Sequence, residues 1–266
     1  MTTMDLKSTF TVRRIVIMGV LAAVAILLGV TRLGFIPVPT PAGNATIMHI
    51  PAIIGGVLEG WPAGAVIGTI FGLFSFFQAT DAIFKDPLVA ILPRIFIGIT
   101  PYFVYQALRG VNRIAGFVLA GALALLVIAF VVFAPNFAPQ SPVFQFGGTL
   151  ESPWFKLEGD AAESAFQVAG GLLALLGLAA AGILAYFVYR NQMELLAIGV
   201  AAIAGTLTNT ILVLTMIVVR GYLPADVAWT IGLTHGIPEI IVAVIVTVAV
   251  VAAWKRIETG RGKSSV

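Results

Sequence analysis

The sequence has no cysteine and few charged residues. Charged residues make up 10% of the 266-residue chain, whereas a typical soluble domain carries about 25%. The absence of cysteine excludes a disulfide framework, a thiolate metal site and a cysteine nucleophile. Hydrophobic residues, in contrast, make up 59% of the chain. This composition indicates an integral membrane protein rather than a soluble domain.

The common signatures of enzymes and nucleotide-binding proteins are also missing. The chain contains no HExxH, no G-x-S-x-G, no Walker A sequence and no glycine-rich dinucleotide-binding turn. We therefore expect a protein that is not an enzyme, with no resident metal and no cofactor bound by this chain. If it takes part in active uptake, the energy must come from an ion gradient or from a partner protein.

Eight hydrophobic segments are present, and most are long enough to form membrane helices, which need about 20 residues. Their continuous apolar character is typical of helices rather than of the alternating strands of an outer-membrane barrel. We expect an all-α fold, a polytopic transmembrane bundle that forms a single membrane domain over residues 1–266. The segments run approximately over 12–31, 46–59, 62–79, 87–108, 112–133, 164–189, 193–219 and 228–254.

Lysine and arginine are unevenly distributed between the connecting segments. If the amino terminus faces the cytoplasm, the outer segments hold only Arg32, Lys85, Lys156 and Arg220. The cytoplasmic segments hold Lys7, Arg13, Arg14, Arg109, Arg113, Arg190, Lys255, Arg256, Arg261 and Lys263. This bias predicts a multi-pass protein of the prokaryotic plasma membrane with both termini in the cytoplasm. It also accounts for the net charge of +3 without a nucleic-acid partner.

Two of the expected outer loops are unusual. The loop at 33–45 contains three prolines, which predicts an extended and fairly stiff segment. The loop at 134–163 is longer, and loops of this length are uncommon without a role. Its composition is compatible with either a lid or a disordered connection.

A small set of polar residues interrupts the apolar segments. An intramembrane Asn, Thr or His often serves only to bond neighbouring helices, whereas a buried Arg or Glu is costly and marks function more often. The topology places the whole set at a similar depth, which predicts one substrate-binding layer in the outer half of the membrane. The candidates come from five segments and are Asn44, Thr46, His49, Gln78, Arg94, Asn209, His235 and Glu239.

The chemistry of this layer indicates the kind of ligand. Arg94 lies about 10 Å along its helix from Pro87, at about 1.5 Å per residue. A fixed guanidinium favours an anionic ligand, and a carboxylate fits it in bidentate fashion. His235 and Glu239 are four residues apart and share one helix face. The amides and imidazoles would bond hydroxyl or amide groups, so we expect a small carboxylated molecule that enters from outside.

Four stretches of the chain carry a family resemblance. They are NATIMHIPAIIGGVLEGWPAGAVIGTIFGLFSF (44–76), DPLVAILPRIFIGI (86–99), GTLTNTILVL (205–214) and GIPEIIVAVIV (236–246). They resemble the substrate-binding S component of an energy-coupling factor (ECF) vitamin transporter. The first two stretches match in order and spacing, and the last two match in order.

The resemblance implies capture of a vitamin under the loop that joins the first two helices, here 33–45. It also implies partners: a transmembrane coupling subunit and two ATPase subunits, which use ATP and make the S component topple among the membrane lipids. S components dock through small residues on the first helix, here Gly19 and Ala23. Pantothenate and folate are the favoured ligands and cobalamin is less favoured, because Arg94 suits a carboxylate.

The chain departs from the family in its number of helices. The family core has six helices, whereas eight are expected here. We expect core helices at about 12–108 and 193–254, and an insertion of two helices and the outer loop at about 111–190. The insertion would form an extra lid or a lipid-facing support.

Three other functions stay open on the residues alone. Glu239 and His235 would suit a proton relay in a proton-coupled secondary transporter. His49, His235 and Glu239 would suit the ligands or acid–base groups of an intramembrane metal-dependent enzyme. A structural or regulatory membrane subunit would bind no small ligand at all.

Overall fold

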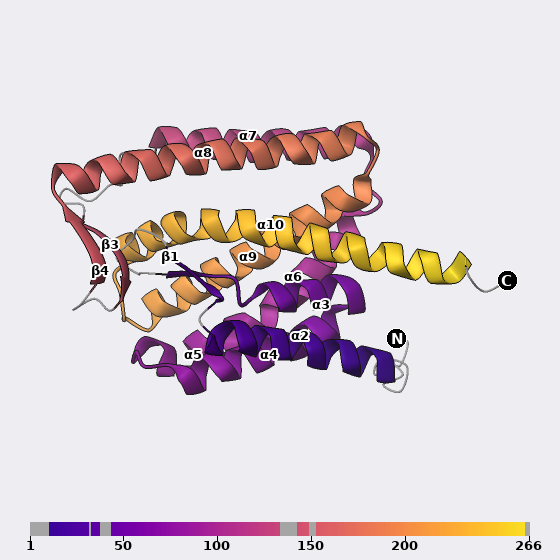
Figure 1. Ribbon diagram of the computed structural model, residues 1–266, viewed down its shortest axis with the longest axis horizontal. Helices are drawn as coiled ribbons and strands as arrows, with labels where there is room; N and C mark the ends of the chain where they lie inside the picture. Colours follow the sequence, from indigo (N-terminus) through magenta and orange to yellow (C-terminus); the bar gives the residue numbers. More distant parts are fainter. Residues whose placement is uncertain (1–10, 32, 38–43, 134–142, 149–152, 264–266) are drawn as a thin grey trace.

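A computed structural model describes residues 11–31, 33–37, 44–133, 143–148 and 153–263. The chain is almost entirely helical there, as predicted (Figure 1). In order, the elements are α2 (Val12–Val30), β1 (Phe35–Pro37), β2 (Asn44–Thr46), α3 (Ile50–Glu59), α4 (Trp61–Gln78), η1 (Ile83–Lys85), α5 (Pro87–Ala90), α6 (Leu92–Leu108), α7 (Arg113–Phe133), β3 (Val143–Gly148), β4 (Pro153–Glu158), α8 (Asp160–Tyr189), α9 (Met193–Val219) and α10 (Ala225–Lys263).

Five stretches of the described chain are long and apolar enough to cross a membrane. Each contains at most two charged residues in its most apolar window, so burial in hydrocarbon leaves few charges to be desolvated. The all-α membrane fold expected from composition is confirmed. The stretches are Val12–Val30, Trp61–Gln78, Pro87–Leu108, Met193–Val219 and His235–Arg256.

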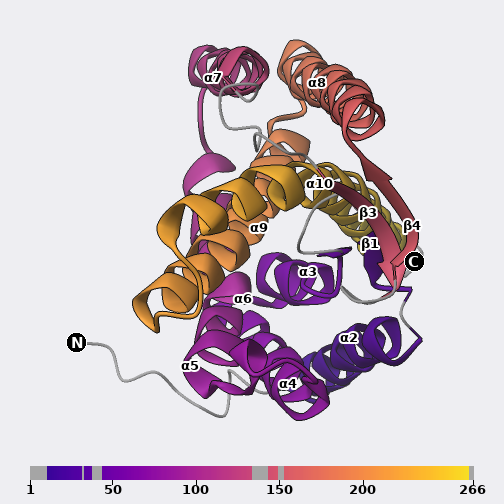
Figure 2. The same cartoon turned by 90° about the vertical axis from the view of Figure 1, so that its left-hand side faces the viewer.

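Helix α3 is too short to cross a membrane, because it has only 10 residues. At about 1.5 Å per residue it rises about 15 Å, half of the hydrocarbon thickness. Its residues are nearly all buried, and α2, α4, α6, α9 and α10 surround it (Figure 2). The helix ends at Gly60, whose φ of 96° suits glycine and lets the chain reverse into α4.

The core forms where these five helices pack around α3. Small and branched apolar side chains fill this core, and the small ones let the helices pack closely. The backbone polar groups of the described helices are paired within the helices, so none of them is exposed to hydrocarbon. Fully or largely buried members include Met18, Ala22, Ile53, Ile67, Ile97, Ala202 and Val244.

Helices α4 and α6 approach closely along a row of glycines. A Cβ atom on Gly64 would lie 2.4 Å from the Gly98 carbonyl oxygen, and one on Gly68 would lie 2.1 Å from the Arg94 carbonyl oxygen. Both distances are shorter than non-bonded atoms allow, so only glycine permits this spacing. The row therefore holds the backbone of Arg94 directly against α4.

Helices α7 and α8 form a separate layer beside α9 and α10 (Figures 1 and 2). Ala120, Leu184, Val188 and Leu196 are buried between this layer and α9. Within the long predicted loop, β3 and β4 pair as an antiparallel hairpin with Val143 opposite Glu158. Residues 134–142 and 149–152 of that loop lie outside the described residues.

The two ends of the bundle differ in character. Helix α2 begins and α10 ends at one end, which we call the terminal end (Figure 1). The opposite end, the hairpin end, carries α5 and both strand pairs (Figure 1). There β1 and β2 bring the two sides of the proline-rich loop together, with Phe35 opposite Thr46; residues 38–43 of the loop lie outside the described residues. The prediction that the terminal end faces the cytoplasm stays a prediction.

Candidate functional site

The predicted polar residues converge around the start of α3. His49 precedes α3, Arg94 lies on α6, Asn209 on α9, and His235 and Glu239 on α10. All five are buried, with exposed fractions of 8% or less. Arg94 interacts electrostatically with Glu239 and with His49. The structure therefore brings side chains from four helices into one buried polar layer.

His49 is completely buried. Its Nε2 atom lies 3.1 Å from Thr206 Oγ1, and that hydroxyl also lies 3.0 Å from the Ala202 carbonyl oxygen. The imidazole donates to Thr206 when its proton is on Nε2 and accepts from Thr206 when the proton is on Nδ1. Within the described residues, the buried Nδ1 makes no hydrogen bond of normal geometry.

Arg94 is positioned by the proline that precedes it. Pro93 has no N–H to bond the carbonyl of Val89, four residues earlier, in the helical pattern. That carbonyl instead accepts a hydrogen bond from Arg94 Nη1 at 2.5 Å. The rings of Phe71 and Phe84 lie 5.8 and 5.5 Å from the guanidinium carbon. Among the residues that the structure describes, none accepts a hydrogen bond from the buried Nε of Arg94.

Glu239 connects α10 to the end of the proline-rich loop. Its Oε1 accepts from the backbone N–H of Thr46 at 2.7 Å. Its Oε2 lies 3.5 Å from Thr210 Oγ1, whose proton has a nearer acceptor in the Thr206 carbonyl oxygen at 3.2 Å. The neighbouring His235 contacts the Ile231 carbonyl of its own helix through Nδ1 at 3.1 Å. Glu239 thus anchors strand β2 over the polar layer.

Within the described part of the chain, three buried atoms of this layer lack a hydrogen-bond partner: His49 Nδ1, Arg94 Nε and Asn209 Oδ1. Buried polar groups in folded proteins are nearly always paired, so each exception needs a physical explanation. Arg94 Nε donates hydrogen bonds and Asn209 Oδ1 accepts them, and His49 Nδ1 accepts when the imidazole proton is on Nε2. A ligand with hydroxyl or amide donors and an anionic acceptor would pair all three.

The remaining predicted site residues lie elsewhere or are only partly described. Gln78 ends α4 and is exposed. Thr46 contributes its backbone N–H to Glu239, and the side chain of Asn44 lies outside the described part of the chain. Thr206 and Thr210 are site residues that we did not predict. The signal was the sequence GTLTNT, which places both within one helical turn of Asn209.

The predicted docking residues lie on the outer face of α2. Gly19 and Ala23 are exposed, and a Cβ atom on Gly19 would meet nothing within 4 Å. Large apolar side chains of the same helix, including Ile15, Val16 and Val20, are also exposed. This face is open to lipid or to another membrane helix.

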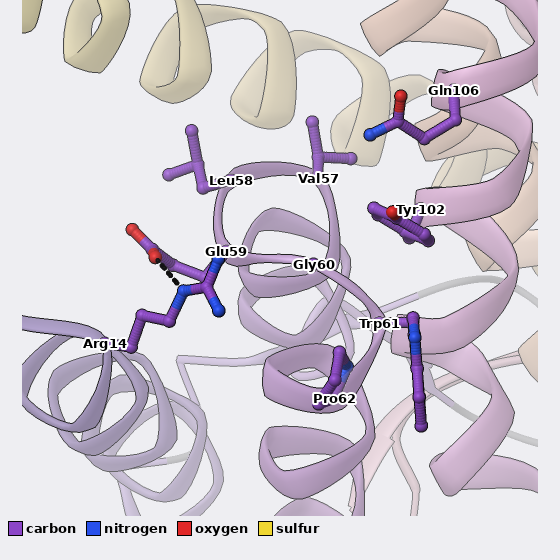
Figure 3. A pocket seen from close by; sticks show the side chains of 9 residues that line it. All are labelled: Arg14, Val57, Leu58, Glu59, Gly60, Trp61, Pro62, Tyr102 and Gln106. Carbon is purple, nitrogen blue, oxygen red and sulfur yellow. Dashed lines mark ion pairs between the residues drawn. The ribbon is translucent and has the colours of Figure 1, made fainter. Parts of the chain in front are cut away.

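A hollow of about 300 Å³ lies at the terminal end, far from the polar layer. The Arg14–Glu59 ion pair, at 3.3 Å, stands at its edge near Trp61 and Tyr102 (Figure 3). Glu59 is at the opposite end of α3 from His49, so this hollow is separate. Its charged groups already pair with each other, whereas the layer has unpaired atoms, which makes the layer the better candidate site.

These features define a class of protein: a multi-pass membrane protein with a layer of buried polar side chains between its helices. The chain belongs to the family of ECF transporter substrate-specific components, whose family profile matches residues 13–157 and 157–251. Members of this family are transport components rather than enzymes. Within the described residues, no three His, Asp or Glu side chains gather as a metal site would require.

The chain is also similar to a curated protein, the pantothenic acid transporter PanT of Lactococcus lactis subsp. cremoris (strain MG1363). The two are 29% identical over 215 residues, which cover 78% of this chain and 76% of PanT. No solved structure matches the chain.

Proposed function

We propose that this chain captures pantothenate in its buried polar layer, for ATP-driven uptake by partner subunits. The observation that carries the proposal is the set of three unpaired atoms, His49 Nδ1, Arg94 Nε and Asn209 Oδ1. Pantothenate has a carboxylate at one end, a central amide and two hydroxyls at the other end. Its carboxylate matches the Arg94 donor, and its hydroxyl and amide protons match the two acceptors.

Charge favours pantothenate over folate, the other leading candidate. Folate carries two carboxylates, whereas Arg94 is the single cation among the described residues that we assign to the layer. A second carboxylate buried without a cation would be costly. The similarity to PanT supports the same choice, and cobalamin offers no free carboxylate to Arg94.

The path of the ligand follows from the anchoring of the loop. The proline-rich loop lies at the hairpin end, and Glu239 holds its strand β2 by the Thr46 N–H. In this proposal, release of the Glu239–Thr46 bond frees β2 from α10, while β2 stays paired with β1, and opens the layer toward the hairpin end. Glu239 therefore acts on the loop, while Arg94, His49 and Asn209 contact the ligand.

Energy for uptake comes from partners in this proposal. A transmembrane coupling subunit docks on the outer face of α2 at Gly19 and Ala23, and two ATPase subunits hydrolyse ATP. The chain itself binds no cofactor. The small side chains permit the close helix approach on which membrane association depends.

Mass spectrometry of small molecules released from gently purified protein tests the proposal. We expect pantothenate, in a ratio approaching one per chain. A different ligand without a carboxylate, or a stoichiometric metal ion, would contradict it. Uptake into vesicles that needs only a proton gradient and no partner subunits would favour a proton-coupled secondary transporter instead.

A further inference from the structure

An ion pair at the hairpin end lies next to the polar layer without belonging to it. Asp86 Oδ2 accepts hydrogen bonds from Arg220 Nε at 2.5 Å and from the Tyr222 hydroxyl at 3.3 Å. The Asp86 side chain is buried and that of Arg220 is about half exposed, at 48%. The pair joins the residue before α5 to the residue after α9. Nothing in the proposed binding step uses it directly.

Asp86 determines where the short helix α5 sits. Its Oδ1 accepts from the Leu88 N–H at 3.0 Å and caps the helix. Helix α5 has only four residues and leads through Ile91 directly into α6, so contacts on its other sides fix how it lies against α9. Val89, which is fully buried, supplies one such contact by packing against Val213 and Ile217 of α9. The Asp86–Arg220 pair supplies another, and both tie α5 to α9.

The position of α5 in turn sets the direction of the Arg94 guanidinium. The protein atom that accepts from Arg94 Nη1 is the carbonyl oxygen of Val89, within α5. Pro93 leaves this carbonyl without a helical partner. Any shift of α5 therefore moves the acceptor, and the guanidinium moves with it. A planar, forked donor loses affinity for a carboxylate when its direction changes.

We propose that Asp86 and Arg220 are positioning residues that aim Arg94 at the carboxylate of the ligand. This inference rests on the proposed function, because it assigns the origin of selectivity at the same site. The pair discriminates acidic ligands from neutral ones of the same shape, although neither residue touches the ligand. The Arg220 side chain of this pair is about half exposed at the hairpin end. A change at Arg220 can therefore alter the ligand selectivity of the layer from outside it.

The test compares two probes, pantothenate and pantothenyl alcohol, in which a CH₂OH group replaces the carboxylate. Binding of each to the full-length purified chain is measured by calorimetry for the native protein, Arg220→Gln, Asp86→Asn and Arg220→Lys. In Arg220→Gln and Asp86→Asn we expect pantothenate affinity to fall about tenfold, which corresponds to about one lost hydrogen bond. Affinity for the alcohol should stay nearly unchanged, and Arg220→Lys should restore part of the preference for pantothenate.

Lys85→Gln is the matched control. Lys85 is an exposed cation beside Asp86, and its removal should change neither affinity. Equal losses for both probes in Arg220→Gln and Arg220→Lys would show a merely structural role and overturn the inference. The inference would also be overturned if Arg220→Gln and Asp86→Asn bound pantothenate and the alcohol as tightly as the native protein does. A native chain that binds neither probe would instead refute the proposed function.

Discussion

At the scale of single residues, Arg94 has the most specific role. Its guanidinium is held by one neutral carbonyl and by two aromatic faces, and its Nε has no acceptor within the described residues. A buried cation of this kind is expensive to maintain. Carboxylate binding gives a physical reason for its presence.

We expect Arg94→Ala to weaken pantothenate binding by at least about 100-fold, because it removes a buried charged partner of the carboxylate. Equilibrium dialysis with labelled pantothenate measures the change. Arg109→Ala, an exposed arginine at the end of the same helix, is the control and should bind normally. Equal affinity in Arg94→Ala would eliminate the carboxylate role.

Asp86 predicts a pH dependence of stability. The Arg220 hydrogen bond, assisted by the Leu88 N–H, lowers the pKa of Asp86 below its ordinary value of 3.8. Because the folded pKa is the lower one, the stabilisation is present above pH 3.8 and is lost as the pH falls through the folded value. Native protein should unfold at a higher temperature than Asp86→Asn at pH 7, and the difference should shrink below pH 3.8. A difference that stays constant between pH 7 and pH 3 would refute this assignment.

At the scale of elements, the glycine contact between α4 and α6 connects packing to the site. A Cβ atom on Gly98 would lie 2.3 Å from backbone atoms of Gly64, and neither helix backbone has a flexible end that can yield. We expect Gly98→Ala to force the helices apart and destabilise the protein by about 1–3 kcal/mol. Ligand affinity should fall too, because α6 carries Arg94. Thermal unfolding with and without pantothenate measures both effects, and unchanged unfolding would contradict the close approach.

Helix α2 offers a second test at this scale, which separates binding from assembly. A side chain at Gly19 meets open space, so Gly19→Leu should leave folding and pantothenate binding unchanged. Co-purification with the coupling subunit should be lost, because a bulky side chain prevents close helix approach. Val12→Leu, at the exposed start of the same helix, is the control. Full co-purification of Gly19→Leu would place docking elsewhere.

At the scale of the whole molecule, continuous apolar runs made the helices predictable. The segment predicted at 193–219 is helix Met193–Val219. The start of α3 was not predictable. Residues 44–46 pair with β1 instead of beginning the helix, and no change in the hydrophobicity of the sequence marks where the strand ends and the helix begins. Helix α10 continues to Lys263 rather than ending near 254, because a helix does not stop where its hydrophobic stretch does.

The site was predictable where the chemistry is unusual for a membrane. A buried Arg94 or Glu239 stands out in an apolar segment, and both are buried as expected. The rotation of an apolar helix is harder to infer, since α4 is hydrophobic on every side and has little amphipathic pattern. That is why the exposure of Gln78 was missed. Thr206 was missed because a threonine in a membrane helix usually bonds only its own backbone, whereas this one also orders His49.

The proposed function requires that the buried layer of this chain bind pantothenate through Arg94, His49 and Asn209. Calorimetric titration of the purified full-length protein with pantothenate tests it most directly. We predict saturable binding of one pantothenate per chain, with no requirement for ATP or partner subunits. Absence of binding to protein whose helical content and cooperative thermal unfolding show that it is folded would contradict the account.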